Sequence, residues 1–142
     1  MQIIDPGMEN TDSRLIKPAY QVSIRKTIPV TLQDLWNYML SYEGIKLWIG
    51  YTGPIIWKRG EKYTKRNGTD FCVRVFKELS HVRVTYTQRE WPNISTIQMK
   101  FVSSKTGTTI SFHQEKLLDE KQQIAMRYHW EKIIAMISKH FK

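Results

Sequence analysis

Residues 119–141, which read DEKQQIAMRYHWEKIIAMISKHF, decide the fold. Apolar side chains recur there every three or four residues, the repeat of one buried stripe on a helix. The stripe consists of Met126, Trp130, Ile133, Ile134, Ile137 and Phe141. Asp119 is placed to act as N-cap, and Gln122, three residues later, can reach back to it as in a capping box. A helix of about 35 Å is marginal alone in water, so the preceding residues must supply a partner surface.

Upstream of this helix, apolar and polar side chains alternate with a period of two, which is typical of half-buried strands. The Asn67-Gly68 pair predicts a hairpin turn between two of these segments. The segments with strand character are 20–24, 60–64, 70–77, 82–87, 97–101 and 110–113. One face of the resulting sheet is apolar, and it is the surface that the long helix needs.

Two short helices are expected between the first and second strands. Thr31 is a suitable N-cap, and the following apolar residues keep the spacing of a helix face. Those residues are Leu32, Leu35, Trp36, Met39 and Leu40. A second helix or turn is expected over residues 41–48, ended by Gly50. The order predicts an α+β fold in which an antiparallel sheet packs against a long C-terminal helix.

Composition indicates one globular domain. The chain has 142 residues, of which 41% are hydrophobic and 25% charged, values typical of a soluble protein. We expect a loose N-terminal leader over residues 1–18 and a single domain over residues 19–142. No apolar run is long enough to span a bilayer, and we therefore expect a cytoplasmic protein. The single cysteine, Cys72, excludes an intrachain disulfide and a CxxC motif.

The chain is basic, with a formal net charge of +9. Part of this charge forms a cluster beside Trp57 and Tyr63 that is similar to a nucleic-acid footprint. The cluster consists of Lys58, Arg59, Lys62, Lys65 and Arg66. Basic residues also protect sheet edges from pairing, and we favour that explanation over a nucleic-acid partner.

Five stretches together resemble one known family. They are YEGIKLWIG at 42–50, VRVTY at 82–86, WPNIST at 91–96, TTISFHQEKL at 108–117 and MRYHW at 126–130. This combination resembles the activator of Hsp90 ATPase homologue 1-like family, within the SRPBCC (START/Bet v 1-like, helix-grip) superfamily. The resemblance implies a curved antiparallel sheet of about six strands that grips the C-terminal helix, with two short helices after the first strand. It also implies a cavity between sheet and helix that, in related families, holds apolar small molecules.

The residues expected to line such a cavity come from the apolar sheet face, the short helices and the inner stripe of the long helix. They are Trp36, Trp48, Val73, Val84, Tyr86, Ile97, Met99, Ile110, Phe112, Met126, Trp130, Ile133 and Ile134. Apolar walls with few polar groups are typical of small-molecule sites. The same residues can instead pack together as a filled core, and flexible Met99 and Met126 would suit a deformable wall.

No catalytic constellation stands out. His113 and Glu115 share one strand face, but the alternation places them opposite Phe112 and so outside the cavity. His129 and His140 share one flank of the long helix, but about 16 Å of rise separates them, too far for one metal ion. No GxSxG, HExxH or glycine-rich phosphate loop is present, so we expect no catalytic residue, metal or cofactor.

We therefore favour a non-catalytic protein that binds a small apolar or amphipathic molecule between sheet and C-terminal helix. The alternative is a protein-interaction module, related to chaperone partners through the family resemblance, that uses its basic outer surface. A third hypothesis is a cyclase- or hydrolase-type enzyme that uses the Tyr86 hydroxyl. The oligomeric state and the ligand's identity stay open.

Overall fold

Six strands form one sheet in the computed structural model, which describes residues 20–142. The expected leader at 1–18 lies outside these residues. The strands are β1 (Tyr20–Ile28), β2 (Lys62–Thr64), β3 (Asp70–Lys77), β4 (His81–Thr87), β5 (Ser95–Ser104) and β6 (Gly107–Leu117). Their spatial order is β1-β6-β5-β4-β3-β2, and every neighbouring pair is antiparallel. The predicted α+β helix-grip fold is confirmed.

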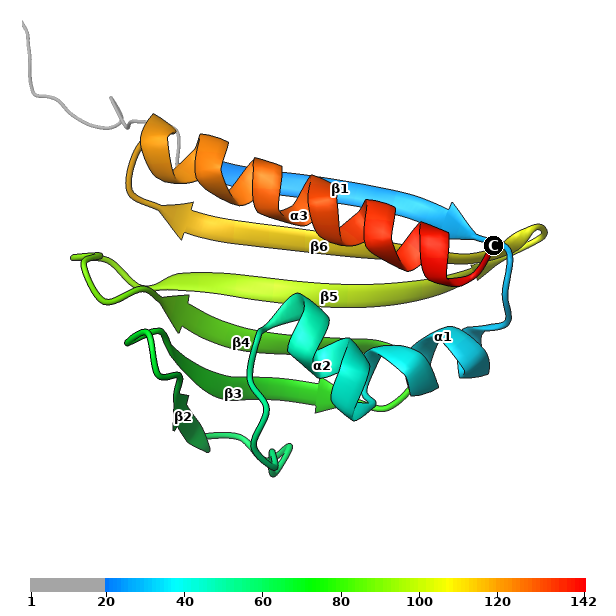
Figure 1. The fold of residues 1–142 in the computed structure, drawn as a ribbon, viewed down its shortest axis with the longest axis horizontal. Helices are drawn as coiled ribbons and strands as arrows, with labels where there is room; N and C mark the ends of the chain where they lie inside the picture. The colour runs from blue at the N-terminus through cyan, green and yellow to red at the C-terminus, as the bar shows by residue number, and fades with distance from the viewer. Residues whose placement is uncertain (1–19) are drawn as a thin grey trace, which may run out of the picture.

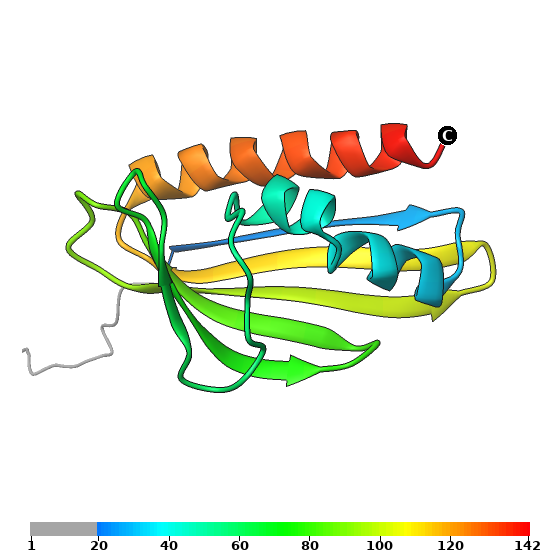
Figure 2. The same ribbon diagram turned by 60° about the horizontal axis from the view of Figure 1, so that its bottom comes forward.

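Three helices lie on one face of this sheet (Figures 1 and 2). The short helices α1 (Leu32–Met39) and α2 (Tyr42–Trp48) follow β1, and the long helix α3 (Glu120–His140) follows β6. Figure 2 shows α3 above the β1 and β6 side of the curved sheet, while α1 and α2 lie above its other strands. Among residues 20–142, no helix lies on the opposite face of the sheet.

Local sequence explains where these helices begin. The Thr31 side chain accepts a hydrogen bond from the Asp34 backbone N–H at 3.1 Å, and the Asp119 side chain accepts one from Gln122 at 2.9 Å. The expected return bond from Gln122 to Asp119 is replaced, because the Gln122 side-chain oxygen Oε1 accepts from the Leu118 backbone N–H instead. Gln122 also forms a reciprocal amide pair with Asn93 in the β4–β5 loop, a partner that helix capping rules do not foresee.

The core beneath α3 is built around Trp130. Its indole ring stacks on Phe112 with ring centroids 4.5 Å apart. Its Nε1–H donates to Gln114 Oε1 at 2.9 Å, and Gln114 Nε2 donates to Ser95 Oγ at 2.9 Å. Gln114 is fully buried, because β6 places it on the apolar face of the sheet. A hydrogen-bonded relay thus satisfies the polar groups that this packing buries.

The predicted hairpin turn joins β2 to β3. The Lys65 backbone N–H donates to the Thr69 carbonyl at 2.8 Å, and the Asn67 side chain accepts from the Thr69 N–H at 3.0 Å. Gly68 has φ +88°, a backbone conformation that glycine adopts without strain. The Asn-Gly signal therefore places the turn correctly.

Candidate functional site: a groove between α2 and α3

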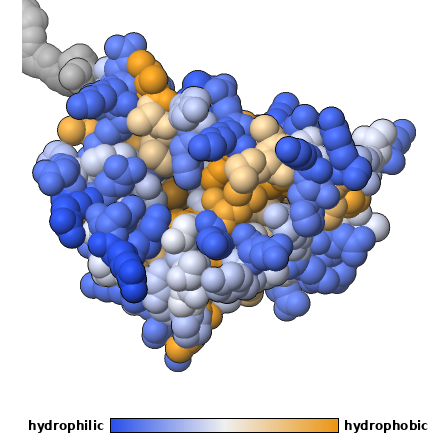
Figure 3. Space-filling view, in the orientation of Figure 1, coloured by the Kyte–Doolittle hydropathy of each residue, from blue (hydrophilic) through white to orange (hydrophobic). Residues whose placement is uncertain are grey.

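A groove of about 710 Å³ separates α2 from α3. Its apolar residues come from three elements: Tyr38 from α1, Leu47 from α2, and Ile133 with Met136 from α3. Met136 is 48% exposed, so part of this apolar surface contacts solvent. Figure 3 shows hydrophobic atoms gathered in the hollow between the two helices, with hydrophilic atoms around it. The groove offers an apolar surface that an incoming molecule can cover.

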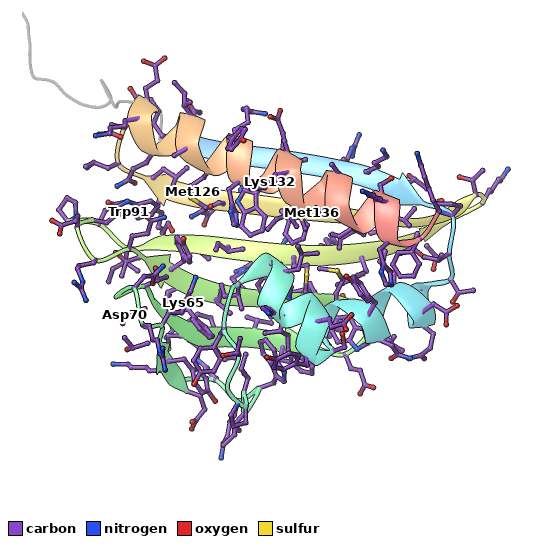
Figure 4. All side chains as sticks on the ribbon, viewed as in Figure 1. Lys65, Asp70, Trp91, Met126, Lys132 and Met136 are labelled. Carbon is purple, nitrogen blue, oxygen red and sulfur yellow. The ribbon has the colours of Figure 1, made fainter. Side chains whose placement is uncertain are left out.

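The rim of the groove is mainly cationic. Lys46 extends from α2, and Lys132 and Lys139 extend from α3, whereas Glu43 is the acidic residue among the lining side chains. Figure 4 shows Lys132 and Met136 along the same stretch of α3, so charge and apolar surface are adjacent. An anionic group bound at this rim would gain charge-assisted hydrogen bonds.

His129 lies on the groove wall that α3 provides. Burial lowers the pKa of His129, a hydrogen bond to the Trp48 backbone opposes this shift, and the charges of Lys65 and Lys132 lower the pKa further. The ring packs edge-on against Trp130 with centroids 4.6 Å apart. Because its pKa is lowered, His129 is neutral near pH 7.

Aromatic packing closes one end of the groove. The His140 ring stacks on Tyr38 at a centroid distance of 4.1 Å, which holds the end of α3 against α1. Burial raises the pKa of the Tyr38 phenol, and the nearby Glu43 carboxylate raises it further. The phenol is therefore neutral and can act as a hydrogen-bond donor inside the groove.

The residues that the sequence predicts as cavity lining are all buried, and all except Val73 belong to one packed core cluster. Ile133 also lines the α2–α3 groove. The buried set comprises Trp36, Trp48, Val73, Val84, Tyr86, Ile97, Met99, Ile110, Phe112, Met126, Trp130, Ile133 and Ile134. Their contact with a ligand stays a prediction.

Tyr86 faces a second pocket of about 650 Å³, where the β4–β5 loop meets the start of α3. Its hydroxyl accepts a hydrogen bond from Gln88 Nε2 at 3.0 Å, and its ring meets Trp91 edge-on at 5.6 Å. Burial raises the pKa of Tyr86, and the Gln88 hydrogen bond partly opposes the shift. Trp91 is labelled in Figure 4 at this end of the molecule.

Sequence reasoning missed most of the groove. Lys132 and Met136 lie beside the predicted inner stripe of α3, and Leu47 lies on α2, for which the sequence predicts no stripe; all three line the groove. The expected shared flank of His129 and His140 is confirmed, since both line the groove. An apolar residue displaced from the stripe, such as Met136, is the signal that points to this second contact face.

The His113–Glu115 pair lies on the helix-free face of the sheet, as expected. His113 Nε2 and Glu115 Oε1 are 3.5 Å apart, and both side chains are partly exposed.

Within residues 20–142, no three His, Cys, Asp or Glu side chains are grouped closely enough to hold a metal ion. In the same range, no helix combines the length and the apolar character needed to cross a membrane.

The sequence match agrees with the fold. The family described as activator of Hsp90 ATPase homolog 1-like protein matches residues 29–142, most of the chain. The chain belongs to this family. No curated protein sequence matches it closely.

Solved structures share the fold of this family member at low sequence identity. Protein MLL2253 from Mesorhizobium loti superposes with a TM-score of 0.71 at 14% identity, covering 84% of this chain and 94% of that one. CalU16 from Micromonospora echinospora gives a TM-score of 0.73 at 12% identity, with coverage of 87% and 75%. CV1439 from Chromobacterium violaceum gives 0.72 at 10% identity, with coverage of 86% and 96%. These likenesses establish the fold, which is consistent with a ligand-binding or interaction module.

Proposed function

We propose that this protein is a non-catalytic binding protein for a small amphipathic anion, which it holds in the groove between α2 and α3. The observation that carries the proposal is the pairing of an apolar floor with a cationic rim. A volume of about 710 Å³ falls within the range of small-molecule sites. Of the residues predicted to line a cavity beneath α3, Ile133 also lines this groove.

The two parts of the ligand have separate partners. An apolar tail lies on Leu47, Ile133 and Met136, and each methylene removed from water contributes about 0.8 kcal/mol. A carboxylate or similar head group bonds to Lys132 and its neighbours on the rim. The tail supplies most of the affinity, and the head group sets the orientation.

The test compares fatty acids with alcohols of equal chain length, measured by displacement of a fluorescent fatty acid. The acids should bind more tightly, and Met136→Glu should abolish binding because it places a charge where the tail lies. Lys132→Glu should reduce the advantage of the acid over the alcohol. Ile124→Glu is the matched control, since Ile124 is exposed on α3 but does not line the groove.

Two results would contradict the proposal. One is the absence of binding by any amphipathic anion in the panel. The other is an equal loss of affinity in Met136→Glu and Ile124→Glu, which would indicate nonspecific adsorption to apolar surface. Thermal unfolding of each variant shows whether it is folded.

A further inference from the structure

A row of outward side chains, three of them cationic, crosses the helix-free face of the sheet. Arg25 pairs with Ser111, Ser111 with Lys100, Lys100 with His81, and His81 with Lys77. Directly paired residues in antiparallel strands project from the same face. These five positions, which we call the cationic row, therefore run in line from β1 through β6, β5 and β4 to β3. With strands about 5 Å apart, the row is about 20 Å long.

The positive charge of this row is accessible. Arg25, Lys77 and Lys100 are exposed, and so is Arg83, which lies one row away. Burial lowers the pKa of His81, and the charges of Arg83, Lys77 and Lys100 lower it further. The cations are thus close enough for their fields to add at His81.

Within residues 20–142, no acidic side chain lies at the centre of the row. On the same face, Asp70 and Glu115 lie toward the opposite strand ends, where Asp70 accepts a hydrogen bond from Thr64 and Glu115 lies beside His113. Glu78 follows Lys77 in the β3–β4 turn, at one end of the row. From β1 to β4, this face therefore carries the cations of the row toward one set of strand ends and Glu115 toward the other, while on β2 and β3 Lys62 and Asp70 lie near each other at the second end.

The neighbouring side chains restrict the kind of partner. Among the described ladder positions, the outward residues beside the row are polar or valine and include no Phe, Tyr or Trp; the aromatic rings on this part of the face are the imidazoles of His81 and His113. Val102 is an exposed apolar residue next to the row, too small to anchor a protein in a lipid bilayer. Arg83 is held by Gln98 Oε1 at 2.6 Å, so its guanidinium is oriented before a partner arrives. An oriented guanidinium suits a carboxylate, which it can bind through two parallel hydrogen bonds.

We infer that the cationic row, together with the neighbouring Arg83, is a docking surface for an acidic, unstructured segment of another protein, in which Glu or Asp side chains bind Arg25, Lys100 and Arg83. Charge complementarity selects the partner, and a flexible segment can follow the convex sheet face. This surface lies on the opposite side of the sheet from the α2–α3 groove, so the inference does not depend on the proposed ligand.

The test measures binding of a fluorescein-labelled peptide in which glutamate alternates with serine, by fluorescence anisotropy at low and high salt. The full chain should bind the peptide, and added salt should weaken binding because the contacts are exposed. The double variant Arg25→Glu/Lys100→Glu should lower the affinity about tenfold or more. The control variant Arg66→Glu/Arg127→Glu lowers the net charge equally at exposed sites away from the row and should change the affinity less than about twofold.

Three outcomes would overturn the inference. The first is an equal loss of affinity in both double variants, which would indicate attraction by net charge alone. The second is equal or tighter binding of a single-stranded oligonucleotide or of phosphatidylserine vesicles. The third is a set of peptide-induced NMR shifts confined to α2 and α3. Because all four substituted residues are exposed, the variants should keep the thermal unfolding profile of the parent chain.

Discussion

At the scale of single residues, the buried relay from Trp130 through Gln114 to Ser95 explains how a polar side chain is accommodated beneath α3. The relay continues through Ser95 Oγ, which donates to the Tyr86 carbonyl at 2.7 Å. The Trp130 ring is thus stacked on Phe112, and its N–H has a hydrogen-bond acceptor in Gln114. It is packed as a central core residue, with the groove to one side of it.

Replacing Gln114 by leucine should destabilise the protein. The side chain keeps a similar volume, but the Trp130 N–H loses its acceptor in a site without solvent, which costs about 1–3 kcal/mol. Urea unfolding measures the loss. The control is Gln98→Leu on the helix-free face. It should cost less than about 1 kcal/mol, because Arg83, which donates to Gln98, is exposed and can bond to water instead. Equal costs at the two sites would show that the relay contributes little.

At the scale of elements, the short distance between α1 and α2 depends on one glycine. Gly44 lies in α2, and a Cβ atom there would collide with the Tyr38 carbonyl oxygen and with the Met39 backbone. The Trp48 Nε1–H also donates to the Met39 carbonyl at 3.1 Å, which fixes the angle between the two helices. The position of α2, and hence one wall of the groove, follows from this contact.

Gly44→Ala should therefore lower the free energy of unfolding. Helix propensity alone favours alanine by about 1 kcal/mol, but the added methyl group must push two backbones apart, and such overpacking costs about 1–3 kcal/mol. We expect steric repulsion to dominate because backbone atoms cannot rotate away. Thermal unfolding monitored by circular dichroism measures the change, and a variant more stable than the parent would contradict the close contact.

At the scale of the whole molecule, global stability should fall as the pH falls through the titration range of histidine. Burial and nearby cations lower the pKa of His129 and of His81 in the folded state. The unfolded chain takes up these protons first, so acid favours unfolding between the ordinary histidine pKa of about 6.5 and the lower folded values. Above this range both histidines are neutral in the folded and the unfolded chain, so their titration no longer lowers the stability.

His129→Gln should reduce this dependence on pH. Denaturant midpoints recorded from about pH 8 to about pH 5 should decline less steeply in the variant, because glutamine gains no proton in either state. Above about pH 7.5 the difference between the two proteins should be constant. Parallel slopes across the whole range would show that His129 has the same proton affinity in both states.

The sequence predicts the elements well because their signals are local. The caps Thr31 and Asp119 and the Asn67-Gly68 turn each act through neighbours a few residues away. Strand ends are less predictable, and β5 extends beyond the expected 97–101 to Ser95–Ser104, because pairing with β6 sustains it. The groove is least predictable, since it depends on the separation of α2 and α3.

The sequence by itself determined the order of elements, the apolar face of each and the family to which the chain belongs, because periodicity, capping and motif similarity can be read from consecutive residues. Only the tertiary structure decided that Gln122 pairs with Asn93, that Gln114 belongs to the core, and that Met136 and Lys132 border a groove. It also decided that Arg25, Lys100 and Lys77 form one row. The physical reason is that these relations join residues distant in the chain, and their distances are set by sheet register and helix packing.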